Sequence, residues 1–402
     1  MKPELAPWAT VFVVSAVATW LLVWPVRRLA VALGALVRPD QRRVHERPTP
    51  TLGGLAMLGG LLVGMGVARF HDYFSPMFTS TTEPLGVVVS ACVIYLVGAI
   101  DDLREVSAPA RLAGMALAAS LLVFSGVSML NFRVPFDGVL ILSPDLSYFV
   151  SVMWVVGMAN ALNFVDGLDG LAGGITAIAA STFFLYALRL VDAGILLEGN
   201  VGPLVAVVVA GVCVGFLPHN VHPARIFMGD GGAYLLGLLM AASTMVVGGR
   251  TDQEFSGQTY FFFAPLVIPL VILGVPIVDT LFAILRRATR GRGVATADKD
   301  HLHHRLMRLG HGQRRAVVIL WAWTALLSGF VLYPTYTGEG DAIVPLGVAG
   351  MALLLYTLFH PGLRRNRTDE LQAAGGIARS DPKPTIMQAE APADLRREPR
   401  SP

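Results

Sequence analysis

The sequence predicts an all-α polytopic membrane protein of about eleven transmembrane helices. Of the 402 residues, 54% are hydrophobic and only 15% are charged, and the mean hydropathy is +0.60. A soluble domain carries about 25% charged residues. Apolar runs of the length that spans a bilayer as a helix, about 20 residues, recur along most of the chain. These observations exclude an ordinary soluble globular protein.

The apolar runs define the predicted elements in order. They cover residues 7–31, 51–69, 85–100, 110–129, 148–165, 173–190, 201–218, 231–248, 261–285, 316–333 and 343–360. The first run has neither a basic region before it nor an A-x-A cleavage site after it, so we expect a retained helix and not a signal peptide. Residues 131–147 contain short alternating runs, which predict a small extracytoplasmic hairpin.

The chain is expected to form one membrane unit followed by a tail. Residues 1–361 hold every apolar run, and we interpret them as a single integral membrane domain. Residues 362–402 are polar, rich in Arg, Pro, Glu and Ala, and show no apolar period. This composition predicts a disordered cytoplasmic tail.

Basic residues in the short loops predict the orientation. Lys and Arg accumulate in cytoplasmic loops of membrane proteins. Here they gather after the first and the ninth run, at Arg38, Arg42, Arg43, Arg47, Arg290, Arg292, Lys299, Arg305, Arg308, Arg314 and Arg315. The N-terminus is therefore expected outside and the C-terminus in the cytoplasm, in a bacterial inner membrane. The net charge of +3 reflects this bias and gives no argument for nucleic acid.

The polar segments that could carry chemistry all fall on the predicted cytoplasmic side. They read RRVHERPTPTLGG, DDLREVSAPAR, NFVDGLDGLAGG, PHNVHPARIFMGDGG and ATADKDHLHHRLMRLGH, and they follow the odd-numbered runs. The loops of opposite parity hold no comparable density of Asp, Asn and His. We therefore expect one reaction centre at the cytoplasmic membrane face.

The stretch NALNFVDGLDGLAGG predicts a cation site. If the preceding helix continues through it, Asn160, Asn163 and Asp166 share one face. Amide and carboxylate oxygens suit a hard cation such as Mg²⁺, which also takes water and phosphate ligands. The alternative is a turn between helices that is rich in Asn, Asp and Gly.

Two further acidic sites have open interpretations. Adjacent carboxylates near apolar surroundings raise a pKa, so Asp101 and Asp102 could supply a base or a metal ligand. They could also be a hydrated pair at a helix end, or an ion pair with Arg104. Asp230, in FMGDGGAYLLG, either caps a helix or joins a metal and phosphate site at the helix N-terminus.

The segment DKDHLHHRL favours phosphate binding over zinc. His301, His303 and His304 stand beside Arg305, whose guanidinium matches phosphate oxygens. No Cys is near, and the spacing differs from the H-E-x-x-H zinc pattern. A basic loop at an anionic lipid surface is the alternative. For Arg43 and His45, the positive charge of cytoplasmic loops alone is a sufficient explanation.

Five segments, in their order along the chain, resemble the polyprenyl-phosphate N-acetylhexosamine-1-phosphate transferases of glycosyltransferase family 4. They are RRVHERPTPTLGG, DDLREVSA, NALNFVDGLDGLAGG, FMGDGGAYLLG and DKDHLHHRL. The likeness covers about residues 38 to 310. It implies transfer of a sugar-1-phosphate from a UDP-sugar to undecaprenyl phosphate in the membrane, with release of UMP. It also implies dependence on Mg²⁺, with Mn²⁺ as an alternative ion. We expect the chain to act alone or as a homodimer, with no nucleic acid partner.

The resemblance also implies roles for single residues. Asp101 and Asp102 match the aspartate pair that acts on the lipid phosphate, and Asn163 and Asp230 match metal-binding positions. The positions expected to bind substrate are Asp166, Asp169, His303, His304, Arg305, Arg43 and His45.

Within the family, the sequence favours N-acetylglucosamine-1-phosphate transfer that starts a surface glycan such as O-antigen or teichoic acid. The peptidoglycan branch, which transfers phospho-MurNAc-pentapeptide, carries three consecutive histidines and then a glutamate. Here the segment reads His301-Leu302-His303-His304-Arg305. That branch remains the alternative. A secondary transporter is the alternative from another class, but its polar residues would lie near the membrane midplane. A CDP-alcohol phosphotransferase would need an Ala-Arg that DGLDGLAGG lacks.

Overall fold

A computed structural model describes most of the chain. The described residues are 5–37, 48–104, 106–134, 138–197, 199–248, 312–337 and 343–359. Contacts group Met1–Phe359 into one unit, separate from His360–Pro402. The predicted tail lies outside the described residues, so its disorder stays a prediction.

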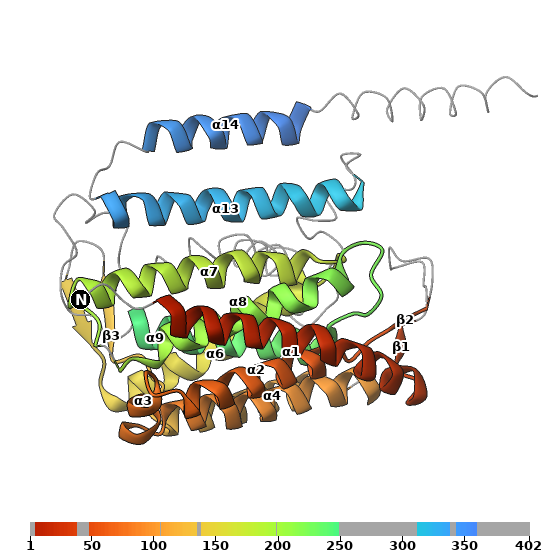
Figure 1. The fold of residues 1–402 in the computed structure, drawn as a ribbon, viewed down its shortest axis with the longest axis horizontal. Coiled ribbons are helices and arrows are strands. Elements are labelled where there is room, and N and C mark those ends of the chain that lie inside the picture. Colours follow the sequence, from red (N-terminus) through yellow and green to blue (C-terminus); the bar gives the residue numbers. More distant parts are fainter. Residues whose placement is uncertain are drawn as a thin grey trace, which may run out of the picture. The chain divides into compact units, whose positions relative to one another are not determined.

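The described part is mostly helical, and its long helices overlap the predicted ones (Figure 1). They are α1 (Leu5–Ala32), α2 (Gly54–Phe70), α4 (Glu83–Arg104), α5 (Ala108–Phe124), α6 (Pro144–Val165), α7 (Leu171–Asp192), α8 (Val201–Asn220), α9 (Gly229–Gly248), α13 (Gln313–Thr337) and α14 (Ile343–Phe359). Seven of them, namely α1, α4, α6, α7, α8, α9 and α13, are long and apolar enough to cross a membrane. The chain is therefore a multi-pass membrane protein. The predicted helix at 261–285 lies outside the described residues, so the total of eleven and the orientation stay predictions.

Two short strand pairs and one short helix complete the described elements. β3 (Asn131–Val134) and β4 (Gly138–Ile141) pair antiparallel, which confirms the predicted hairpin. It ends before residue 147, because α6 begins at Pro144. β1 (Leu36–Val37) pairs with β2 (Thr49–Pro50) and was not predicted, and neither was α3 (Ser75–Ser80).

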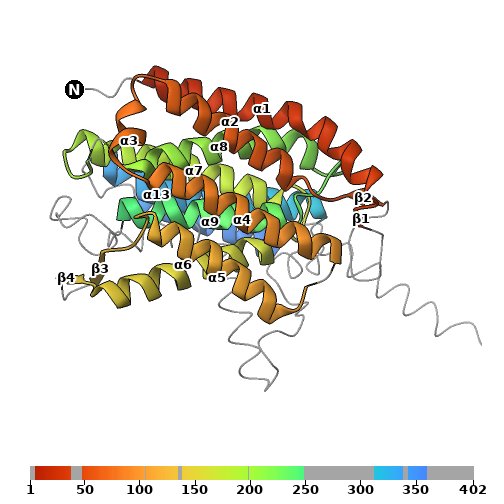
Figure 2. The same ribbon diagram turned by 90° about the horizontal axis from the view of Figure 1, so that it is seen from below.

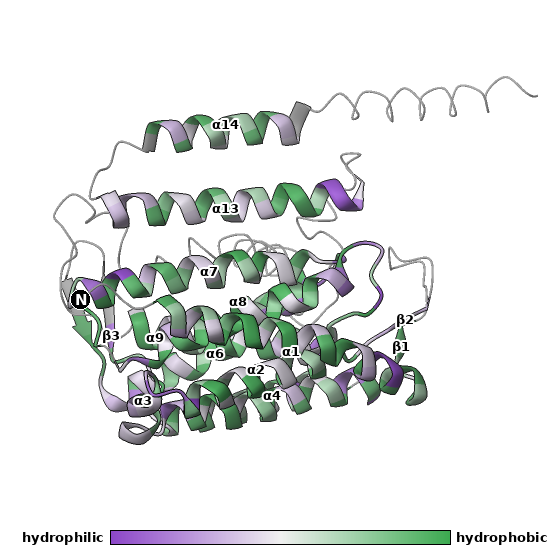
Figure 3. Cartoon of the chain, viewed as in Figure 1, coloured by the Kyte–Doolittle hydropathy of each residue, from purple (hydrophilic) through white to green (hydrophobic). Residues whose placement is uncertain are grey.

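Helix α9 forms the centre of the bundle. It packs against α2, α4, α6 and α8, and every residue from Gly231 to Gly248 is buried. α1 covers α2 and α8, while α7 lies between α8 and α13 (Figure 1). The peripheral helices expose apolar side chains, among them Val13, Val17 and Leu21 of α1. Figure 3 shows this apolar character along the helices, with hydrophilic residues mostly near their ends. Such an exterior suits a lipid environment.

Small residues bring the neighbouring helices close to α9. A Cβ added to Gly98 of α4 would overlap the backbone of Gly231, and one added to Gly237 would overlap Ala159 of α6. Small residues at helix interfaces are typical of membrane proteins, because they let backbones approach closely. These contacts fix the start of α9 against α4.

The two strand pairs mark opposite ends of the bundle. β1 and β2 lie at one end, and β3 and β4 lie at the other (Figure 2). At the end that holds β2, the loops that follow α6 and α8 are hydrogen-bonded to each other, and the last turn of α4 is hydrogen-bonded to the start of α9, as described below.

Candidate active site

The polar residues converge on the N-terminus of α9. Asp230 lies in the first turn of this helix. Its backbone N–H donates to Oδ1 of Asp102 on α4 at 3.1 Å, and the N–H of Gly231 donates to Oδ2 at 3.4 Å. A carboxylate at this place also interacts favourably with the helix dipole. Asp102 therefore caps α9, and the side chain of Asp230 is left for another role.

Asn163 completes this contact from the last turn of α6. Its Nδ2 donates to Oδ1 of Asp230 at 2.7 Å. The structure thus brings together the two residues predicted to bind metal. Asn160 does not join them, because its Nδ2 donates to the carbonyl oxygen of Val156 at 2.8 Å in its own helix.

The adjacent Asp101 has different surroundings. Its Oδ2 pairs with Nη1 of Arg111 on α5 at 2.8 Å, and its Oδ1 accepts from the N–H of Val106 at 2.7 Å. Asp101 is buried, whereas Arg104, the partner considered from sequence, is exposed. Both carboxylate oxygens of Asp101 thus hold the turn between α4 and α5. Asp101 also lies within hydrogen-bonding reach of the Asp230 side chain, whereas Asp102 accepts from the backbone at the start of α9.

The loop after α6 is tied to the loop after α8. Oδ2 of Asp169 accepts from the N–H of Ala224 at 3.0 Å and lies 2.8 Å from Nδ1 of His222. Asn220 makes a second link: its Oδ1 accepts from the N–H of Gly170 and its Nδ2 donates to the carbonyl of Ile226, both at 3.0 Å. Three of these bonds join the two loops, and the Asn220–Ile226 bond holds the loop after α8 against the end of its own helix.

The segment at the start of α2 is hydrogen-bonded to the chain just before α9. The N–H groups of Gly53 and Gly54 each donate at 2.9 Å, to the carbonyls of Phe227 and Met228 respectively. Gly229 then adopts a φ of +72°, and a Cβ on it would overlap the Asp102 carboxylate and lie 2.6 Å from Oγ1 of Thr51. Glycine is therefore required at this turn.

The carboxyl groups of Asp102, Asp166, Asp169 and Asp230 lie near one another, and we call them the acidic cluster. Asp166 follows the end of α6, and burial raises the pKa of its carboxyl to about 8. The carboxylates of Asp230, Asp102 and Asp169 contribute further to this shift, in that order. A cation at the cluster would favour the ionised form of Asp166, because an opposite charge stabilises a carboxylate.

The residues present fit a magnesium ion. Carboxylate and amide oxygens are hard ligands, and Asp230, Asn163 and Asp102 offer them side by side. Within the described ranges, no three His, Cys, Asp or Glu side chains form a ready metal-binding group. Mg²⁺ usually takes one or two carboxylates and completes its shell with water and phosphate, so such a sparse protein site is suitable.

The other predicted substrate-binding residues lie outside the described residues. They are Arg43, His45, His303, His304 and Arg305. Their proximity to the acidic cluster stays a prediction. Conversely, the sequence reasoning did not single out Arg111, Asn220 or His222. Asn220 and His222 belong to the polar segment PHNVHPAR, which was their only signal.

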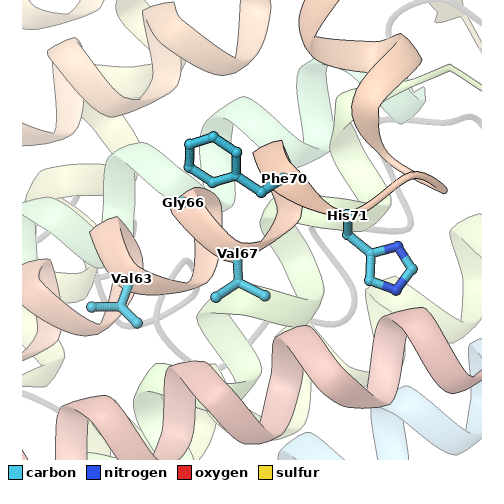
Figure 4. Close-up of a pocket in the computed structure, with 5 residues that line it drawn as sticks. All are labelled: Val63, Gly66, Val67, Phe70 and His71. Carbon is cyan, nitrogen blue, oxygen red and sulfur yellow. The ribbon is translucent and has the colours of Figure 1, made fainter.

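A shallow groove elsewhere does not belong to this site. It is lined by Val63, Gly66, Val67, Phe70 and His71, near the C-terminal end of α2 (Figure 4). α2 begins beside the acidic cluster at Gly54, and its 17 residues carry the chain about 24 Å away. The groove also lacks any carboxylate.

Comparison with known proteins finds one family profile and several similar transferases. The sequence profile of glycosyl transferase family 4 matches residues 84–248, which run from α4 to α9. The chain is 38% identical over 372 residues to a decaprenyl-phosphate N-acetylglucosaminephosphotransferase of Mycobacterium tuberculosis, with 89% of each chain covered. It is 35% identical over 321 residues to a probable undecaprenyl-phosphate N-acetylglucosaminyl 1-phosphate transferase of Bacillus subtilis, covering 80% of this chain and 81% of the relative. It is also similar to a phospho-N-acetylmuramoyl-pentapeptide-transferase of Desulforudis audaxviator, at 31% identity over 345 residues, covering 80% of this chain and 95% of the relative.

Proposed function

Because the chain belongs to glycosyl transferase family 4, we propose that it transfers N-acetylglucosamine-1-phosphate from a UDP-sugar to a polyprenyl phosphate. A phosphate oxygen of the lipid attacks the sugar-bound phosphorus of the donor. The bond from that phosphorus to the oxygen bridging to UMP breaks, and UMP leaves with the bonding electrons. The observation that carries the proposal is the meeting of Asp102, Asn163 and Asp230 at the start of α9.

This reaction brings several negative charges together, which explains the proposed cation. Asp230 and Asn163 would hold Mg²⁺, and the bound ion would neutralise the diphosphate of the donor. Asp166 lies close enough to Asp230 to be affected by its charge. Its raised pKa supports a place beside the ion, where it would ionise and help to retain it.

The two adjacent aspartates are proposed to have separate roles. Asp102 faces the start of α9 and would act on the lipid phosphate. Asp101 is engaged with Arg111 and Val106, so it would position the turn that carries Asp102. Asp169 would contribute by holding the loop after α6 against the loop after α8 through His222 and Ala224. The proposal is completed by phosphate binding at the predicted residues outside the described part. These are Arg43, His45, His303, His304 and Arg305.

The site is proposed to face the cytoplasm of a bacterial cell, at the inner membrane. The basic residues after the first apolar run support a cytoplasmic face. The bonds between the loops after α6 and α8, and between the end of α4 and the start of α9, support one common side for these segments. An outer N-terminus and a cytoplasmic tail follow. A fluorescent reporter fused after His360 should therefore fluoresce, and a phosphatase fused there should be inactive. The reverse result would place the acidic cluster outside.

The reaction itself is tested with purified protein in lipid. Label from UDP-N-acetylglucosamine should appear on undecaprenyl phosphate, with equal UMP release, and decaprenyl phosphate serves as the second acceptor. EDTA should abolish transfer, and Mg²⁺ should restore it. Transfer from only UDP-MurNAc-pentapeptide would assign the chain to the peptidoglycan branch. No transfer from either donor would favour a transporter.

A further inference from the structure

A row of aromatic and basic side chains lies on the exposed face of α1. Trp20 and Trp24 are 44% and 49% exposed, and Arg27 and Arg28 follow them, also exposed. Spacings of three and four residues place these side chains on one face of a helix. We call these four residues the α1 strip. It lies toward the C-terminal end of α1, the end that leads into β1 (Figure 1).

The α1 strip is joined to the loop between α8 and α9. Nε–H of Arg27 donates to the backbone carbonyl of Arg225 at 3.2 Å, and Arg225 is itself exposed. The ring of His219, at the end of α8, lies against both tryptophans, with ring centroids 6.2 Å from Trp20 and 5.9 Å from Trp24. His219 is only 4% exposed, and its Nε2 has no hydrogen-bond partner within the described residues.

The α1 strip and the neighbouring Arg225 carry only positive charge. Arg27, Arg28 and Arg225 take part in none of the ion pairs found among the described residues, which are Arg111–Asp101 and His222–Asp169. Three exposed guanidinium groups that pair with no acidic side chain in the described part of the chain attract an anion, and their planar donors match phosphate oxygens.

The geometry points to the phosphate of an anionic membrane phospholipid as the ligand of the α1 strip, and we propose this site as a new one. Tryptophan is enriched at the membrane interface, where its ring lies at headgroup level. The step from Trp24 to Arg28 advances about 6 Å along the helix. The headgroup layer is about 5–7 Å thick on each side of the hydrocarbon core. With the tryptophans at the inner edge of that layer, the arginines reach the lipid phosphates.

The surroundings select a lipid over a soluble anion. Leu21 and Leu29 are exposed beside the strip, so α1 presents hydrocarbon to the bilayer on the same face.

Tryptophan fluorescence in nanodiscs tests the site. Brominated acyl chains quench nearby tryptophans, so quenching by brominated phosphatidylglycerol is compared with quenching by brominated phosphatidylcholine. One arginine at an anionic surface is worth about a five-fold preference. We expect the wild type to prefer phosphatidylglycerol by at least that factor, and Arg27→Gln/Arg28→Gln to bring the preference close to one. Trp20→Phe/Trp24→Phe should remove the lipid-selective part of the signal.

The matched control removes the same charge elsewhere. Arg314 and Arg315 are adjacent and exposed at the start of α13, where the nearest tryptophans, Trp321 and Trp323, are half-buried. Arg314→Gln/Arg315→Gln should keep the preference. Equal quenching by both lipids in the wild type, an equal loss in the control, or displacement by millimolar inorganic phosphate would each overturn the proposal. If the double variant fails to fold, Arg28→Gln alone decides, since it leaves the Arg27–Arg225 bond intact.

Discussion

Replacing Gly229 by Ala tests whether the position of Asp102 governs turnover. Gly229 has a φ of +72°, which costs an L-residue about 1–2 kcal/mol. The added Cβ would also lie 2.6 Å from Oγ1 of Thr51 and closer still to the Asp102 carboxylate. Non-bonded heavy atoms prefer about 3.5 Å, so the carboxylate must move by about 1 Å. A displacement of that size in a reaction centre can lower turnover by about 100-fold.

The control is Gly194→Ala. Gly194 has a similar φ of +69°, but no atom lies within 4 Å of the added Cβ, and it follows α7 at the other end of that helix. Both variants should lose thermal stability through backbone strain, measured as the unfolding midpoint in detergent, and Gly229→Ala should lose more because its Cβ also meets Asp102 and Thr51. Only Gly229→Ala should lose UMP release in the transfer assay. If both variants kept wild-type turnover, or both lost it to the same degree, Asp102 placement would not be the controlling factor.

Three further outcomes follow from the site. Asp102→Asn should lower turnover by about 10²–10⁴-fold with only a small loss in the unfolding midpoint, because the remaining amide oxygen can still accept one of the two capping bonds. Asp101→Asn breaks the ion pair with Arg111 and should mainly lower the midpoint; equal effects on both quantities would contradict separate roles. The pKa of Asp166 is raised to about 8, so the folded protein keeps a proton that the unfolded chain loses above about pH 4. The unfolding midpoint of the wild type in EDTA should therefore fall between pH 6 and pH 8 relative to that of Asp166→Asn. Midpoints of the two proteins that change in parallel with pH would refute this. Asn220→Ala leaves a backbone N–H and a carbonyl unpaired in two clamped loops, and calorimetry should show a loss of about 1–3 kcal/mol together with slower UMP release.

The helices were predictable because each depends on a local apolar run. The β3–β4 hairpin was predictable for a similar reason, since its alternation is visible in the sequence. The β1–β2 pair was not, because two-residue strands carry no periodic signal, and their pairing depends on how α1 and α2 are arranged.

The site was predictable in its composition and less so in its geometry. Asn163 and Asp230 were expected to meet, and they do. Asp101 and Asp102 are neighbours in sequence, but consecutive side chains on a helix point about 100° apart. Which of them caps the backbone of α9 and which pairs with Arg111 depends on the packing of α4 between α5 and α9, and no local pattern encodes it. Asn160 precedes Asn163 by three residues and was expected on the same helix face, yet its side chain donates to a backbone carbonyl of its own helix.

The burial of α9 from Gly231 to Gly248 makes the acidic cluster insensitive to changes in the thickness of the bilayer. Membrane helices answer a change in hydrocarbon thickness by tilting, and this response acts on the surfaces that lipid touches. α1, α6 and α13 have such surfaces, whereas α9 is buried from Gly231 to Gly248. The outer helices can therefore adjust to thinner or thicker membranes while Asp230 keeps its distances to Asp102 and Asn163. Chains of this architecture could thus be moved between bacterial membranes of different lipid composition without retuning the acidic cluster.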